Sequence, residues 1–101
     1  MEMKLRYTPL FEKEITSALS YLIHQLHDSK AAQDLKQELD RAAELVQRYP
    51  YSMSSYPTRA GRRETYRAVD VKNYLAFYVI LDDTVEFRRF LPSRSDFAKK
   101  L

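Results

Sequence analysis

The stretch RRETYRAVDVKNYLAFYVILDDTVEFRRFL, residues 62–91, decides the fold. Its middle segment, residues 74–81, is apolar on both faces, and the segments on either side alternate polar and apolar residues. A period of two is typical of β-strands, and a strand that is apolar on both faces is typical of the centre of a sheet. The short sequences Val71-Lys72-Asn73 and Asp82-Asp83 favour tight reversals. We therefore predict an antiparallel meander with strands over residues 62–69, 74–81 and 84–91.

Two helices are predicted upstream of the meander. Apolar residues recur every three or four positions over residues 11–26 and again over residues 35–49, which indicates two amphipathic helices. Thr8-Pro9 precedes the first helix and Asp28-Ser29 the second, and such side chains cap helix amino termini, while proline fits the first turn. Pro50 ends the second helix. Because the connection is short, the two helices are expected to form an antiparallel hairpin.

The remaining segments complete a β-α-α-β-β-β order with a helical tail. Residues 3–7 alternate like a half-buried strand, residues 50–61 have the composition of a loop, and a short final helix capped by Ser93 or Ser95 is expected to end at Leu101. The sequence predicts one α+β domain over residues 1–101, in which a four-stranded, largely antiparallel sheet carries the helical hairpin on one face. The other face stays partly open and is lined by arginines. Side chains expected in the core are Leu19, Leu22, Leu39, Leu45 and Phe77.

Composition narrows the class of protein. The chain has 101 residues, no cysteine and a single glycine, Gly61, so neither a disulfide framework nor a glycine-rich phosphate loop is expected. The longest apolar run, residues 74–81, is too short to cross a membrane, and the charged start is unlike a signal peptide, which favours a cytoplasmic protein. No cofactor or metal is expected, since His24 and His27 have metal-like spacing but no third ligand nearby.

Positive charge gathers in the second half of the chain. The net charge of +3 divides into −1 over residues 1–50 and +4 over residues 51–101. Most of the cations in the second half are arginines, whose planar guanidinium suits phosphate or carboxylate. This distribution favours an anionic partner.

An ordered set of short motifs resembles the RelE/ParE toxins of bacterial toxin–antitoxin pairs. In that family a Tyr-Arg pair on the first meander strand is followed by a Tyr-x-x-x-Tyr strand, a Val-x-Ile-x-Arg strand and an Arg-Arg-Asp-like ending. The matching positions here are Tyr66-Arg67, Tyr74 and Tyr78, Val85 and Arg89, and Arg94 and Asp96. The likeness extends over essentially the whole chain.

The resemblance implies this fold and one of two activities. RelE-like members bind at the ribosomal decoding site and cleave messenger RNA, whereas ParE-like members inhibit DNA gyrase and cleave nothing themselves. Both are neutralised by an antitoxin whose carboxy-terminal segment wraps the toxin. The expected partners are therefore a small acidic antitoxin and, as target, either gyrase or the ribosome with its message, and no membrane.

Candidate catalytic residues follow from the chemistry of metal-free RNA cleavage. That reaction needs a base for the 2′-hydroxyl, an acid for the leaving oxygen and cations for the phosphate. By resemblance, Arg67 matches the arginine that contacts the scissile phosphate, and Arg89 and Arg94 match two further family arginines. Glu64 is the carboxylate placed to act as a base, because it lies two residues before Tyr66 on the same side of the strand.

Other side chains are expected to contact a nucleic acid or a target protein: Arg59, Arg62, Arg63, Arg88 and Tyr56. Arg67 equally fits a structural role, in which it pairs with Asp70 or Glu86 and holds the meander.

One position departs from the RNA-cleaving pattern. Those members usually carry Tyr or His near the end of the last strand, where this chain has Pro92, which can donate no proton; the second arginine of the Arg-Arg-Asp ending is Ser95. The missing acid favours a ParE-like inhibitor that acts by binding its target, and leaves it uncertain that the chain is an enzyme. The alternatives are a RelE-like ribonuclease, supported by the arginines, and an inactive relative that only binds and regulates.

Overall fold

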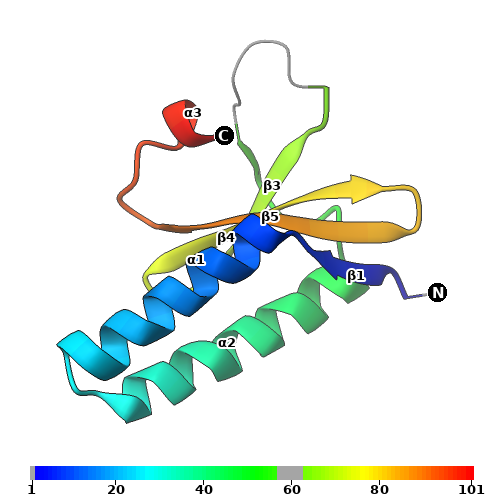
Figure 1. Ribbon diagram of the computed structural model, residues 1–101. Coiled ribbons are helices and arrows are strands. Elements are labelled where there is room, and N and C mark those ends of the chain that lie inside the picture. The colour runs from blue at the N-terminus through cyan, green and yellow to red at the C-terminus, as the bar shows by residue number, and fades with distance from the viewer. Residues whose placement is uncertain (1, 57–62) are drawn as a thin grey trace.

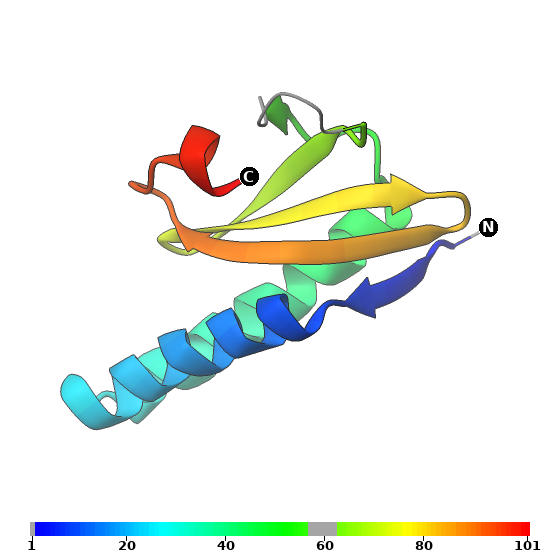
Figure 2. The same ribbon diagram turned by 45° about the horizontal axis from the view of Figure 1, so that its top comes forward.

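In the computed structural model, two long helices lie on one side of a sheet and a short carboxy-terminal helix lies on the other (Figure 1, Figure 2). The structure describes residues 2–56 and 63–101. Its elements in chain order are β1 (Lys4–Tyr7), α1 (Pro9–Ser20), η1 (Tyr21–Gln25), α2 (Ser29–Arg48), β2 (Ser55–Tyr56), β3 (Tyr66–Val71), β4 (Tyr74–Leu81), β5 (Thr84–Pro92) and α3 (Phe97–Lys100). The predicted α+β class is confirmed.

Both long helices begin where the sequence predicts. The Thr8 hydroxyl accepts a hydrogen bond from the Phe11 amide at 3.2 Å, and Pro9 occupies the first helical position. Asp28 Oδ1 accepts a hydrogen bond from the Ala31 amide at 2.9 Å. Each cap satisfies a backbone donor that the first turn of a helix leaves without an intrahelical partner.

The first helix differs from the prediction at its carboxyl end, where Tyr21–Gln25 form a π-helical turn, η1. A π turn closes its hydrogen bonds over five residues instead of four, so the side chains after it rotate out of the apolar stripe. Leu26, expected at the end of that stripe, is exposed, and Leu22 is only partly buried. His27 then adopts a φ of 51°, which turns the chain towards α2.

The sheet has five strands in the order β1-β5-β4-β3-β2, one more than predicted. β1 pairs with β5 in parallel, and the other pairs are antiparallel. The added strand, β2, lies within residues 50–61, which the sequence predicts to be a loop. It forms because the Tyr56 backbone pairs with Tyr66 and the Tyr56 ring packs on Phe77, with 5.4 Å between the ring centroids. The predicted bounds of the first meander strand are also wrong. β3 extends to Val71, whose side chain is fully buried.

A β-bulge interrupts β5. Phe77 pairs with Arg89 whereas Tyr78 pairs with Phe87, so Arg88 has no partner on β4. A bulge bends its strand and redirects the side chains beside it. Arg88 and Arg89 consequently make contacts in two different parts of the molecule.

β4 is buried on both faces, as its composition predicts. On the helix side, α1 and α2 pack against the sheet around a cluster that includes Phe11, Leu35, Leu39, Val46, Tyr78 and Phe87. On the opposite side a second cluster includes Tyr66, Phe77, Val79, Leu91 and Leu101. Leu101 is 1% exposed, so the face predicted to stay partly open is covered by the end of the chain itself (Figure 2).

The predicted core is right in part. Leu39 and Phe77 are buried, but Leu19 and Leu22 are only partly buried, and Leu45 is 45% exposed. α2 presents Leu39 and Val46 to the sheet, and Leu45 falls on the flank of that face.

Candidate functional site

An ion-pair cluster lies on the sheet face opposite the helices. All three nitrogens of the Arg88 guanidinium donate hydrogen bonds there: Nε to Glu86 at 2.9 Å, Nη2 to Glu64 at 3.1 Å and Nη1 to the Tyr66 hydroxyl at 3.2 Å. Arg6 of β1 donates to the second oxygen of Glu86 at 3.1 Å. We call these five residues the β5 cluster. Its two arginines and two carboxylates balance one another in charge.

The β5 cluster keeps its buried groups ionised. Burial opposes the ionisation of Glu86, but hydrogen bonds from Arg88 and Arg6 outweigh it and lower the pKa of Glu86 below its ordinary 4.5. Burial likewise opposes the charge of Arg88, yet bonds to Tyr66 and Glu86 raise the pKa of that guanidinium. Glu64, the predicted base, therefore faces a guanidinium that is permanently charged.

Arg67 lies on the other face of the sheet. It pairs across the sheet with Tyr78, which belongs to the helix-side core. Its Nη1 donates to the backbone carbonyls of Met53 at 2.7 Å and Tyr51 at 3.3 Å, and its Cζ lies 5.5 Å from the Tyr51 ring centroid. Arg67 thus ties the segment after α2 to the sheet. It is not brought together with Glu64, and it pairs with neither Asp70 nor Glu86.

Tyr78 reinforces the same connection. Its hydroxyl donates to the Pro50 carbonyl at 2.6 Å. Burial raises the pKa of Tyr78 to about 12, although the charge of Arg67 opposes the shift. The phenol therefore keeps its proton, and the hydrogen bond, through neutral pH.

Arg89 joins three elements at the far end of β5. Its Nη2 and Nε lie 2.8 Å and 3.1 Å from the two carboxylate oxygens of Glu14 on α1. Its Nη1 donates to the Lys100 carbonyl of α3 at 2.6 Å. Glu14 also accepts the Phe90 amide at 2.9 Å. The predicted catalytic arginines Arg67 and Arg89 and the predicted binding arginine Arg88 thus occupy three separate places, and each is bonded to the protein itself.

The other predicted residues do not form one site. Tyr56 packs in a triangle of rings, 5.4 Å from Phe77 and 5.9 Å from Phe97, so it serves the core. Arg63 and Arg94 are exposed. Pro92 ends β5 at the surface. The predicted residues Arg59 and Arg62 lie outside the described residues.

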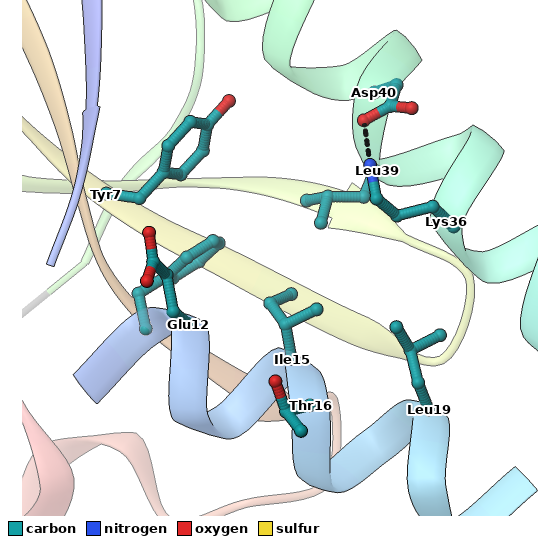
Figure 3. Close-up of a pocket in the computed structure, with 9 residues that line it drawn as sticks. Tyr7, Glu12, Ile15, Thr16, Leu19, Lys36, Leu39 and Asp40 are labelled. Atoms are coloured by element: carbon teal, nitrogen blue, oxygen red, sulfur yellow. Dashed lines mark hydrogen bonds and ion pairs between the residues drawn. The ribbon is translucent and has the colours of Figure 1, made fainter. Parts of the chain in front are cut away.

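A groove of about 540 Å³ runs between α1 and α2, and we call it the interhelical groove (Figure 3). Its floor is apolar, with Phe11, Ile15 and Leu19 of α1 facing Leu39 of α2. This opening explains why Leu19 is only partly buried. The rim carries Glu12 of α1, Lys36 and Asp40 of α2, and the hydroxyl of Tyr7, and Lys36 donates to Asp40 at 2.7 Å. Burial and the neighbouring Asp40 raise the pKa of Tyr7.

A second groove, of about 430 Å³, lies along the outer side of α1 against the end of β5. We call it the α1–β5 groove, and its lining includes Leu10, Lys13, Tyr21, Arg89, Pro92 and Lys100. This groove is not predicted from the sequence, because the apolar periodicity of residues 11–26 indicates only the inner face of α1. The available signal was the spacing of Leu10 and Tyr21, eleven residues or about three helical turns apart.

No group of three or more His, Cys, Asp or Glu side chains within residues 2–56 and 63–101 is arranged to hold a metal ion. No helix in that part of the chain is both long and apolar enough to span a membrane.

Comparison with solved structures defines the class of protein. A chain of the chromosomal ParDE TA system from P. aeruginosa matches with a TM-score of 0.69 at 12% sequence identity, covering 90% of this chain and 96% of that chain. A chain of the E. coli DinJ-YafQ toxin-antitoxin complex matches with a TM-score of 0.60 at 14% identity, covering 97% and 100%. YafQ from E. coli strain BL21(DE3) matches with a TM-score of 0.56 at 16% identity, covering 90% and 93%. The fold is that of the RelE/ParE toxins.

The sequence itself identifies the family. A family model described as the ParE toxin of the type II toxin–antitoxin system parDE matches residues 5–97. The chain belongs to this family of type II toxins. No curated protein sequence matches the chain.

Proposed function

We propose that this toxin acts by binding a target protein, DNA gyrase, and does not cleave RNA. The observation that carries the proposal is the engagement of the strand arginines. Arg67 is bonded to backbone carbonyls, Arg88 to two carboxylates and a phenol, and Arg89 to Glu14. An arginine that stabilises a phosphorane must aim its donors at the incoming phosphate. Here all three nitrogens of Arg88 and of Arg89, and Nη1 of Arg67, donate within the protein.

The proposal includes a partner and a place of action. A small acidic antitoxin neutralises the toxin, as the family description of a toxin–antitoxin pair leads us to expect. Gyrase acts on the chromosome, so the toxin acts in the cytoplasm. Binding of a protein target uses exposed side chains, and the exposed Arg63 and Arg94 are among the described arginines available for it.

Two assays on the same purified protein test the proposal. We expect the toxin to inhibit DNA supercoiling by gyrase at stoichiometric concentrations. We also expect messenger RNA on translating ribosomes to stay intact, as read by primer extension. Unaffected supercoiling together with cleaved message would overturn the proposal.

One observation favours the ribonuclease as a second candidate. Glu64, Tyr66 and Arg88 lie within hydrogen-bonding distance in the β5 cluster and supply a carboxylate, a phenol and a guanidinium. These are the groups that metal-free cleavage needs as base, acid and phosphate ligand. Tyr66, however, is 3% exposed, so a substrate would reach it only after the covering segments move.

The second candidate has its own test. If the β5 cluster cleaves RNA, Tyr66→Phe should abolish cleavage while the protein stays folded, because only the hydroxyl is lost. Arg41→Ala changes an exposed arginine of α2, on the helix side of the sheet, and is the control that should cleave like the wild type. Absence of cleavage by the wild-type toxin removes this candidate.

A further inference from the structure

Besides its buried apolar stripe, α1, together with the turn η1 that continues it, carries two large apolar side chains that face outward. Phe11 and Ala18 form the inner stripe and are buried. Leu10 of α1 and Tyr21, the first residue of η1, lie on the outer side, where they are 47% and 52% exposed. Large apolar side chains that are exposed beside a groove are typical of interaction surfaces. Both residues line the α1–β5 groove.

The rim of this groove is basic. Lys13, Lys100 and Arg89 line it together with one acid, Glu14. Glu14 is neutralised by Arg89 through contacts of 2.8–3.2 Å. The ammonium groups of Lys13 and Lys100 form no ion pair with another residue of the described part of the chain. Two positive charges therefore flank the exposed apolar pair.

The interhelical groove has the opposite character. Its charged lining residues are Glu12, Asp40 and Lys36, and Lys36 is already paired with Asp40. Glu12 is then left as the uncompensated charge, so this groove is weakly acidic. An acidic partner is repelled from the interhelical groove and attracted to the α1–β5 groove.

From this charge difference we propose that the α1–β5 groove is the docking site for an acidic amphipathic helix of the antitoxin. The inference rests on the proposed function, in which a small acidic antitoxin is the partner. Leu10 and Tyr21 are separated by about 16 Å along α1, the length of three helical turns, which suits a helix laid into a groove. The apolar side of the partner helix covers Leu10 and Tyr21, and its carboxylates meet Lys13 and Lys100.

The end of the chain takes part in this site. The Lys100 carbonyl accepts a hydrogen bond from Arg89 at 2.6 Å, and Leu101 is buried on the sheet. These two contacts fix the backbone of Lys100 at the rim of the groove. The docking site is thus assembled from residues at both ends of the sequence.

Binding of designed peptides tests the site directly. Two fluorescein-labelled helical peptides share one leucine face and carry only glutamate or only lysine on the polar face. We expect the glutamate peptide to bind the full-length toxin in a fluorescence anisotropy titration and the lysine peptide to bind at least tenfold more weakly. Equal binding of the two peptides, or no binding of the glutamate peptide, would overturn the proposal.

Matched charge reversals locate the peptide. Lys13→Glu and Leu10→Asp change exposed positions of α1, and each is expected to weaken binding of the glutamate peptide about tenfold or more. Lys36→Glu makes the same charge change in the interhelical groove and should leave binding within twofold. The reverse pattern, in which only Lys36→Glu weakens binding, places the peptide in the interhelical groove and contradicts the inference. Circular dichroism melts confirm that each variant is folded.

A growth assay separates this inference from the proposed function. The toxin and an acidic antitoxin are co-expressed, and relief of toxicity is scored for the wild type and for Lys13→Glu. Relief of the wild type but not of Lys13→Glu supports the docking site. Equal relief of both overturns the docking site alone, whereas no relief of the wild type contradicts the proposed function.

Discussion

Tyr78 shows how a single hydroxyl connects the helical layer to the sheet. The hydroxyl is bonded to the Pro50 carbonyl, directly after α2, so Tyr78→Phe leaves that carbonyl without its partner. We expect the substitution to lower the free energy of unfolding by about 1 kcal/mol, the usual net value of one hydrogen bond. Urea unfolding at pH 7 measures the loss. A variant as stable as the wild type would show that the bond contributes nothing.

The same residue predicts an alkaline signature. Burial raises the pKa of Tyr78 from 10.0 to about 12, so the folded state favours the protonated phenol. This contribution is complete below pH 10 and is lost as the pH rises towards 12. The wild type should therefore lose more stability than Tyr78→Phe between pH 9.5 and 11.5, in parallel urea titrations at the two pH values. Equal losses would contradict the raised pKa.

We predict that the Arg67 side chain stabilises the folded protein. Removing its side chain leaves the backbone carbonyls of Tyr51 and Met53 without this donor. It also removes the contact of the guanidinium with the Tyr51 ring. Because hydrogen bonds from charged groups are the stronger ones, Arg67→Ala should cost about 1–3 kcal/mol in thermal or urea unfolding. Arg94→Ala removes an exposed arginine and should change stability by less than about 0.5 kcal/mol. A loss in the control equal to that of Arg67→Ala would refute the assignment.

These residues mark the limit of what the sequence predicts at this scale. The Tyr66-Arg67 motif singles out Arg67 in the sequence, but it does not predict that the side chain bonds to the segment after α2. Its partners are backbone carbonyls 14 and 16 residues away, and a carbonyl carries no signature in the sequence. Glu64 was correctly placed on the side of Tyr66, yet its partner Arg88 lies 24 residues away on a strand with a bulge.

At the scale of the elements, one ion pair links α1 to β5, in addition to the apolar packing between them. Glu14 and Arg89 have side chains 17% and 23% exposed, and Glu14 also accepts the Phe90 amide. Glu14→Ala leaves a partly buried guanidinium unpaired and is expected to cost about 1–3 kcal/mol, less than the loss for a fully buried pair because solvent still reaches it. A double-mutant cycle with Arg89→Ala checks this, and additive losses would exclude coupling.

Helix α3 is the least self-sufficient element. Four residues are too few for a stable isolated helix, so α3 is held by the packing of Phe97 and Leu101 on the sheet. Leu101→Ala should cost about 2–3 kcal/mol and increase the fluorescence of a hydrophobic dye, because the apolar face around Phe77 becomes accessible. Lys99→Ala changes an exposed residue of α3 and is the control. An unchanged melting temperature for Leu101→Ala would contradict the packing.

The elements were predicted well where one local pattern decides them. β4 was placed correctly because its apolar run can only be central, and both helix starts carry capping residues. β2, the bulge at Arg88 and the π turn of η1 were missed. Each depends on packing between distant segments, as Tyr56 on Phe77 illustrates.

Over the whole molecule, charge separates the two grooves. The net charge of +3 is small, but the α1–β5 groove is basic and the interhelical groove is weakly acidic. Complexes held by complementary surface charge weaken when salt screens them. The complex with an acidic antitoxin should therefore dissociate more readily at 500 mM than at 50 mM NaCl, as measured by calorimetry. Affinity that rises with salt would indicate a purely apolar interface.

The pairing of β1 with β5 has a consequence for how the toxin folds during its synthesis. Arg6 and Glu86 are 80 residues apart in sequence but adjacent in the sheet, so β1 has no neighbouring strand until β5 has been synthesised. Contacts this distant in sequence form late and slow the folding of a chain. Thr8, which caps α1, also depends on β5, since its amide donates to the Phe87 carbonyl at 3.1 Å. The sheet of the toxin is thus completed, and the start of α1 is held in place, only after β5 has been synthesised.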